Sequence, residues 1–92
     1  MQKPRYPLSK YIKAIETILV QKGLDRIEVR NKSGSAVHFD LFEKGETKPR
    51  VMWQVHTEHK SKRTVYSTED YKKAARALNI TPEEFIDVIK SV

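Results

Sequence analysis

Three successive segments in which apolar and polar residues alternate constrain this 92-residue chain more than any other feature. Such alternation places every second side chain on the same face of a β-strand. The segments span residues 26–30, 36–42 and 51–55, and polar turns at 31–34 and 43–49 join them. Their inward residues are all apolar: Ile27, Val29, Val37, Phe39, Leu41, Val51, Trp53 and Val55. We therefore expect a three-stranded antiparallel meander with one apolar face.

Helical periodicity precedes and follows these strands. Apolar residues recur at helical spacing from 8 to 24, and Gly23 is placed to end this first helix. An N-cap serine, Ser67, followed by acidic residues predicts a second helix over 68–78, which Asn79 can stop. A capping box that begins at Thr81, with proline at the first helical position, predicts a last helix over 82–92. The order α-β-β-β-α-α predicts an α+β fold with helices on one face of the meander and an open opposite face.

Size and composition narrow the class of protein. The chain suits a single small domain, 1–92, with one modest core and no deep enclosed substrate pocket. It contains no cysteine, so neither disulfides nor a thiolate metal site can stabilise it. No stretch approaches the roughly 18 apolar residues of a membrane span, and the N-terminus lacks the long apolar run of a signal peptide. We expect a cytoplasmic protein that uses no membrane and no cofactor.

The chain is strongly basic, with 18 Lys and Arg against 12 Asp and Glu and a formal net charge of +6. Its sequence pI near 9.7 exceeds the value of about 9 that indicates nucleic-acid binding, although basic residues can also serve solubility alone. The tightest cluster lies in a predicted loop at 59–63, before an extended segment at 64–66. Candidate phosphate contacts lie in turns, at strand ends and at the start of a helix: Arg30, Lys32, Lys60, Lys62, Arg63, Lys72 and Lys73.

Strand parity places two histidines on the open face. Because the inward residues of the middle strand are odd-numbered, His38 and Asp40 point outward, and by the same count so do Glu28 and His56. Turns centred near Ser33 and on residues 46–48 would align Glu28, His38 and His56 in one row across the sheet. Cross-strand neighbours lie about 4.5–5.5 Å apart at Cβ, within reach for a carboxylate and two imidazoles. A slip of two residues would keep the faces and change the partners.

A carboxylate beside two imidazoles can perform general acid–base chemistry, since the unperturbed pKa of histidine is about 6.5. Metal-independent RNA cleavage needs a base for the 2′-hydroxyl, an acid for the leaving oxygen and cations for the phosphate. The candidate catalytic residues are His38, His56, Glu28 and Asp40. The alternative interpretation is a solvated strand face without catalysis. A metal site from these four residues is disfavoured because they lack a recognised spacing such as His-Glu-x-x-His.

Two further classes of binding protein fit the sequence. The last two predicted helices and the short turn at 79–81 allow a DNA-binding helix-turn-helix. Its recognition helix would carry Glu83, Glu84 and Asp87, whose charge opposes insertion into the major groove. A protein-interaction module without catalysis is the other class, because an unpaired edge strand can accept a strand from a partner.

Four short motifs follow one another along the chain: Lys22-Gly23-Leu24, Gly34-Ser35, Gln54-Val55-His56 and the stretch ALNITPEEF at 77–85. Their order resembles the HicA, or YcfA-like, family of small mRNA interferase toxins from toxin–antitoxin systems. The resemblance implies a double-stranded-RNA-binding-like fold, RNA as the ligand, endoribonuclease activity and a HicB-like antitoxin as protein partner. The family pattern has its catalytic histidine directly after Gly-Ser, where this chain has Ala36. His38 lies two residues further on, on the same strand face, where it can substitute for that histidine.

Overall fold

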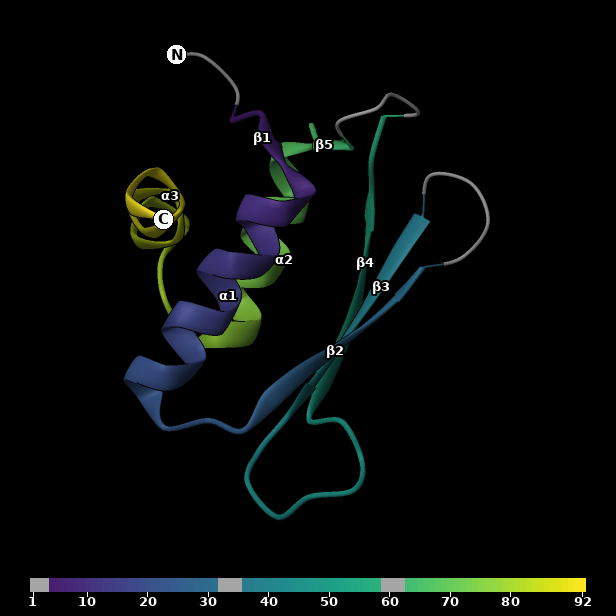
Figure 1. Ribbon diagram of the computed structural model, residues 1–92, viewed down its shortest axis with the longest axis vertical. Coiled ribbons are helices and arrows are strands. Elements are labelled where there is room, and N and C mark those ends of the chain that lie inside the picture. Colours follow the sequence, from purple (N-terminus) through teal and green to yellow (C-terminus); the bar gives the residue numbers. More distant parts are fainter. Residues whose placement is uncertain (1–3, 32–35, 59–62) are drawn as a thin grey trace.

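The computed structural model describes residues 4–31, 36–58 and 63–92 (Figure 1). Its elements are β1 (Tyr6–Pro7), α1 (Leu8–Lys22), β2 (Arg26–Asn31), β3 (Ala36–Phe42), β4 (Val51–His56), β5 (Thr64–Val65), α2 (Thr68–Leu78) and α3 (Pro82–Ser91). The predicted α+β class and the order of the three main strands and three helices are confirmed. The extended segment predicted after the basic loop is β5, which pairs antiparallel with β1, a short strand that the sequence did not predict.

The main sheet is antiparallel, with strand order β2-β3-β4. Val37, Phe39 and Leu41 of the central strand are completely buried, as the alternation predicts. Figure 1 shows all three helices on one side of this sheet. The predicted meander, with one covered and one open face, is therefore confirmed.

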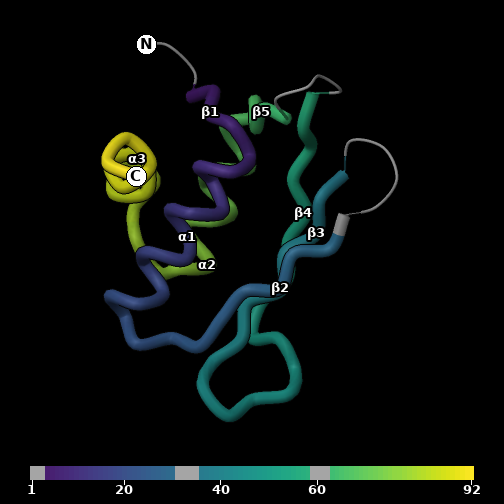
Figure 2. Tube along the Cα trace, viewed as in Figure 1, coloured from purple at the N-terminus to yellow at the C-terminus, as the bar shows by residue number. Residues whose placement is uncertain are grey.

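The helices form two layers on the covered face. α1 and α2 lie next to the sheet, whereas α3 packs on α1 and α2 on the side away from it (Figure 2). Gly23 and Asn79 end α1 and α2 in the left-handed conformation, with φ of 68° and 59°. The predicted capping box at the start of α3 forms: the Thr81 hydroxyl accepts a hydrogen bond from the Glu84 N–H at 3.1 Å. Gly23 thus ends α1 before the chain enters β2, and Asn79 and Thr81 define the short turn between α2 and α3.

Tyr11 of α1 lies at the centre of the core. Its ring centroid is 5.4 Å from that of Phe39, 5.6 Å from that of Tyr71 and 5.3 Å from that of Phe85. The Trp53 indole donates to the Tyr11 hydroxyl at 3.0 Å, and that hydroxyl donates to the Asp70 carbonyl at 2.7 Å. Burial raises the pKa of the Tyr11 phenol far above its usual value, because a phenolate there would lose its hydration. This satisfied polar group joins α1, α2 and the sheet.

Candidate nucleic-acid interface

The predicted row of Glu28, His38 and His56 across the sheet does not form. His38 lies opposite Arg30 on β2 and Gln54 on β4, while Glu28 lies opposite Asp40. In both strand pairs the observed register differs from the predicted one, so every cross-strand partner changes by two positions. A slip of two residues keeps each side chain on its face, which is why parity was predictable and register was not.

The two histidines nevertheless share the open face on adjacent strands. His56 lies opposite Ala36, which makes it a diagonal neighbour of His38, two positions beyond Gln54. Diagonal neighbours lie about 7–8 Å apart, so both imidazoles can contact the same phosphodiester. The Gln54 Nε2 lies 3.4 Å from the His56 Nε2, and the His56 side chain is exposed. His38 is half-buried between its cross-strand neighbours.

Asp40 and Glu28 hold arginines rather than histidines. Asp40 receives two contacts from the Arg30 guanidinium, Nε to Oδ2 at 3.1 Å and the second nitrogen to Oδ1 at 3.2 Å. Glu28 pairs with Arg26 at 3.2 Å. Within the described ranges, no hydrogen bond joins either carboxylate to His38 or His56. Asp40 therefore holds the Arg30 guanidinium opposite His38, whereas Glu28 pairs with Arg26, which lies over the Phe42 ring. The expected carboxylate–imidazole contact is absent from this part of the structure.

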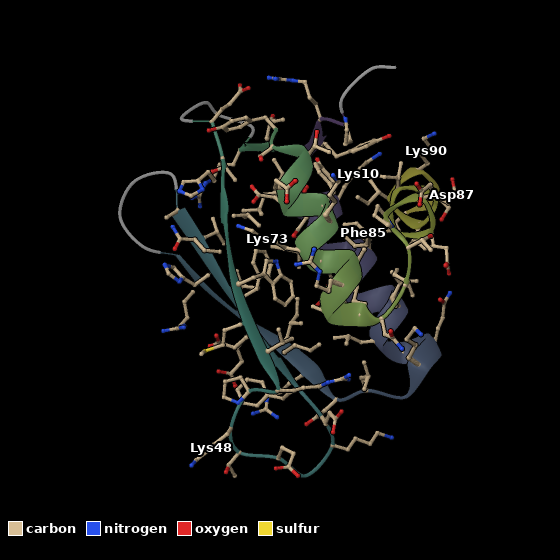
Figure 3. The ribbon with its side chains drawn as sticks, turned by 180° about the vertical axis from the view of Figure 1, so that it is seen from behind. Lys10, Lys48, Lys73, Phe85, Asp87 and Lys90 are labelled. Carbon is tan, nitrogen blue, oxygen red and sulfur yellow. The ribbon has the colours of Figure 1, made fainter. Side chains whose placement is uncertain are left out.

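The remaining predicted phosphate contacts divide among several places. Lys72 pairs with Glu69 on the exposed side of α2. Arg63 donates from Nε to the Thr57 hydroxyl at 3.3 Å, which places it near β5. Figure 3 shows Lys73 pointing from α2 towards β4. Three predicted contacts lie outside the described residues: Lys32, Lys60 and Lys62.

A groove that the sequence did not reveal lies between β4 and α2. Its volume is about 540 Å³, and three cations line it: Arg50, Lys73 and Arg76. Only Lys73 of these three was predicted as a site residue. Arg76 follows Lys73 by three positions and Lys72 by four, a spacing that puts all three on neighbouring positions of a helix surface. This spacing could have identified Arg76 from the sequence. Arg50 could not be assigned from spacing, because it comes from a different element.

Comparisons with protein-family models, with curated proteins and with solved structures found no significant match. Within residues 4–31, 36–58 and 63–92, no cluster of three or more His, Asp or Glu side chains is arranged to hold a metal ion. The same residues include no helix that is long and apolar enough to cross a membrane.

Proposed function

We propose that this protein binds RNA through the open face of its main sheet. The observation that carries the proposal is the placement of Arg30, fixed by Asp40, directly opposite His38, with His56 on the adjacent strand of the same exposed face. A bidentate carboxylate contact holds the guanidinium in place while its side chain stays 52% exposed and able to meet a phosphate. The net charge of +6 favours a polyanionic partner.

The two histidines favour metal-independent cleavage as the activity of this face. One neutral imidazole accepts the proton of the 2′-hydroxyl while the 2′-oxygen forms a bond to phosphorus. The bond between phosphorus and the 5′-oxygen breaks, and the other imidazole, protonated, donates its proton to the leaving oxygen. Arg30 neutralises the charge of the phosphate during the step. A HicA-like role, with messenger RNA as substrate and a HicB-like antitoxin as partner, belongs to the same proposal.

The acidic residues of α3 disfavour the helix-turn-helix alternative. Glu83, Glu84 and Asp87 are all exposed on this helix, where they would face DNA phosphates or base edges. Figure 3 shows Asp87 and Lys90 on the outer side of α3, away from the main sheet. A regulator built on α3 would therefore need to overcome electrostatic repulsion from its own recognition helix.

The test is a denaturing gel of end-labelled structured RNA incubated with the protein in the presence of a chelator. We expect cleavage by the natural protein and by Lys48→Ala, a variant of an exposed loop cation, and none by His38→Ala or His56→Ala. RNA binding is measured separately by fluorescence anisotropy over a range of salt concentrations. Intact RNA in every lane, together with retained RNA binding, would reject the catalytic proposal and leave the RNA-binding proposal standing. A preference for duplex DNA, or binding lost near physiological salt, would reject the RNA proposal.

A further inference from the structure

β4 is an edge strand whose outer edge is closed along only part of its length. Near its C-terminal end, the N–H of His56 donates to the Asp70 carboxylate at 3.1 Å. The Gln54 carbonyl accepts from the Lys73 ammonium at 3.3 Å. Asp70 and Lys73 of α2 thus occupy the positions where a neighbouring strand would form hydrogen bonds. Their side chains also pair with each other, with 3.6 Å between Lys73 Nζ and Asp70 Oδ1.

The outer edge of β4 is uncovered at Met52, two residues before Gln54. Backbone groups of an antiparallel edge strand alternate in direction, so the N–H and C=O of Met52 point the same way as those of Gln54, away from β3. Within the described segments, no hydrogen bond on the outer edge reaches either group. The Met52 side chain is 64% exposed. This position therefore offers one donor and one acceptor beside an exposed apolar side chain.

The groove between β4 and α2 lies beside this open edge. Arg76 and Ala77 line it from α2, and Met52 and Trp53 line it from β4. Arg50 pairs with Glu43 and Lys73 with Asp70, whereas Arg76 has no ion pair with any residue that the structure describes. No acidic residue is among those that line the groove. Its electrostatic potential therefore favours an anionic occupant.

We propose that an extended acidic segment of a partner protein binds in this groove and adds as a strand to β4 at Met52. A peptide backbone supplies both a donor and an acceptor, which match the free C=O and N–H of Met52. Acidic side chains on one phase of the segment would reach Arg76 and Arg50, and apolar ones on the other phase would cover Met52. A phosphate chain fits less well, because phosphate oxygens only accept and would oppose the Met52 carbonyl. Trp53, at 9% exposure, offers no ring for base stacking.

The experiment follows backbone amides by NMR while a short peptide of alternating Val and Glu is added to the full chain. We expect the Met52 amide to shift and to gain protection from hydrogen exchange, and the neighbouring Gln54 amide to shift. Arg76→Glu should weaken peptide binding about tenfold, as loss of one charge pair and gain of a repulsive one predict. Lys90→Glu, the same change at an exposed lysine on α3, should leave the affinity unchanged.

A second probe needs no protein variant. The same peptide with every backbone amide methylated cannot donate to the strand edge through either of its own edges, and we expect its binding to disappear. Equal binding of the methylated peptide, or no shift at Met52 and Gln54 with millimolar peptide, would overturn the proposal. So would shifts of these amides with oligouridine and none with peptide, since the groove would then be an RNA site. RNA cleavage by the open face is measured in a separate assay, so the two proposals can fail independently.

Discussion

The two faces of the main sheet are built from alternate residues of the same strands, yet they satisfy their polar groups differently. On the covered face, Phe39 stacks on Trp53 with centroids 5.2 Å apart, and the indole bonds to the buried Tyr11 hydroxyl. On the open face, the Asp40 carboxylate is held by Arg30, whose side chain is half exposed to water. Packing in a closed interior tolerates little change, whereas exposed ion pairs contribute little to stability. The open face can therefore carry functional residues at small energetic cost.

Truncation of two adjacent residues of β3, one on each face, should affect stability very differently. Phe39→Ala should lower the free energy of unfolding by about 3–5 kcal/mol, because it leaves a cavity among stacked rings. His38→Ala, on the opposite face, should change it by less than about 0.5 kcal/mol. Urea denaturation monitored by Trp53 fluorescence gives both values. Similar losses in the two variants would show that the open face is also part of the stabilising core.

A second comparison uses two carboxylates of low exposure, Asp70 at 2% and Asp40 at 7%. Asp70→Ala should lower the free energy of unfolding by about 3 kcal/mol, since it leaves the His56 N–H without an acceptor and removes the ion-pair partner of Lys73. Asp40→Ala should cost about 1 kcal/mol or less, because it releases only a half-exposed arginine into water. Chemical denaturation of the two variants side by side checks this order. A larger loss for Asp40→Ala would contradict it.

Alkaline pH should destabilise the covered side through the buried phenol of Tyr71. Burial raises the pKa of Tyr71 to about 12, mainly because a phenolate there would be desolvated. The unfolded chain releases this proton near pH 10, so the stabilisation is complete below pH 10 and falls as pH rises towards 12. Urea unfolding at pH 9 and pH 11 should show a smaller decline for Tyr71→Phe than for the natural protein. Lysine titration is common to both, and equal declines would remove Tyr71 as the cause.

The smallest expected change in stability concerns Phe42, whose ring is covered by the Arg26 side chain. The Arg26 guanidinium lies 4.1 Å from the centroid of the Phe42 ring. Arg26→Ala should lower stability by about 1 kcal/mol through loss of this cation–π contact and of covered apolar surface. Glu28→Ala, which removes only an exposed ion pair with Arg26, should lower it by less than about 0.5 kcal/mol. Thermal unfolding in high salt should preserve the difference, and its disappearance would indicate that charge pairing alone holds Arg26.

Local patterns predicted much of the fold because the signals are local. Alternation over β3 identified Phe39 as buried and His38 as outward, and the residues at Gly23, Asn79 and Thr81 predicted where helices end or begin. Each of these inferences depends on neighbours within a few positions along the chain. The short strand β1 was not predicted, since its pairing with β5 depends on a contact between distant segments.

The candidate site was predictable only in part for the same reason. Parity placed His38 and His56 on one face, but it could not select among registers that differ by two residues. The role of Asp70 was also not predictable. In the sequence it resembles an ordinary acidic residue in the first turn of a helix, whereas in the structure it is buried and accepts a hydrogen bond from the His56 N–H of β4. Lys73, predicted as a phosphate contact, bonds to the same strand.

Local sequence patterns were sufficient to predict the α+β class, the two faces of the meander and the helix ends, because alternation and capping depend on residues a few positions apart. The strand register, the Arg30–Asp40 pair beside His38 and the groove lined by Arg50 and Arg76 became visible only in the tertiary structure. Those features bring together residues from separate elements. Their positions depend on how turns close and helices dock, which is set by packing of the whole core and by no single segment.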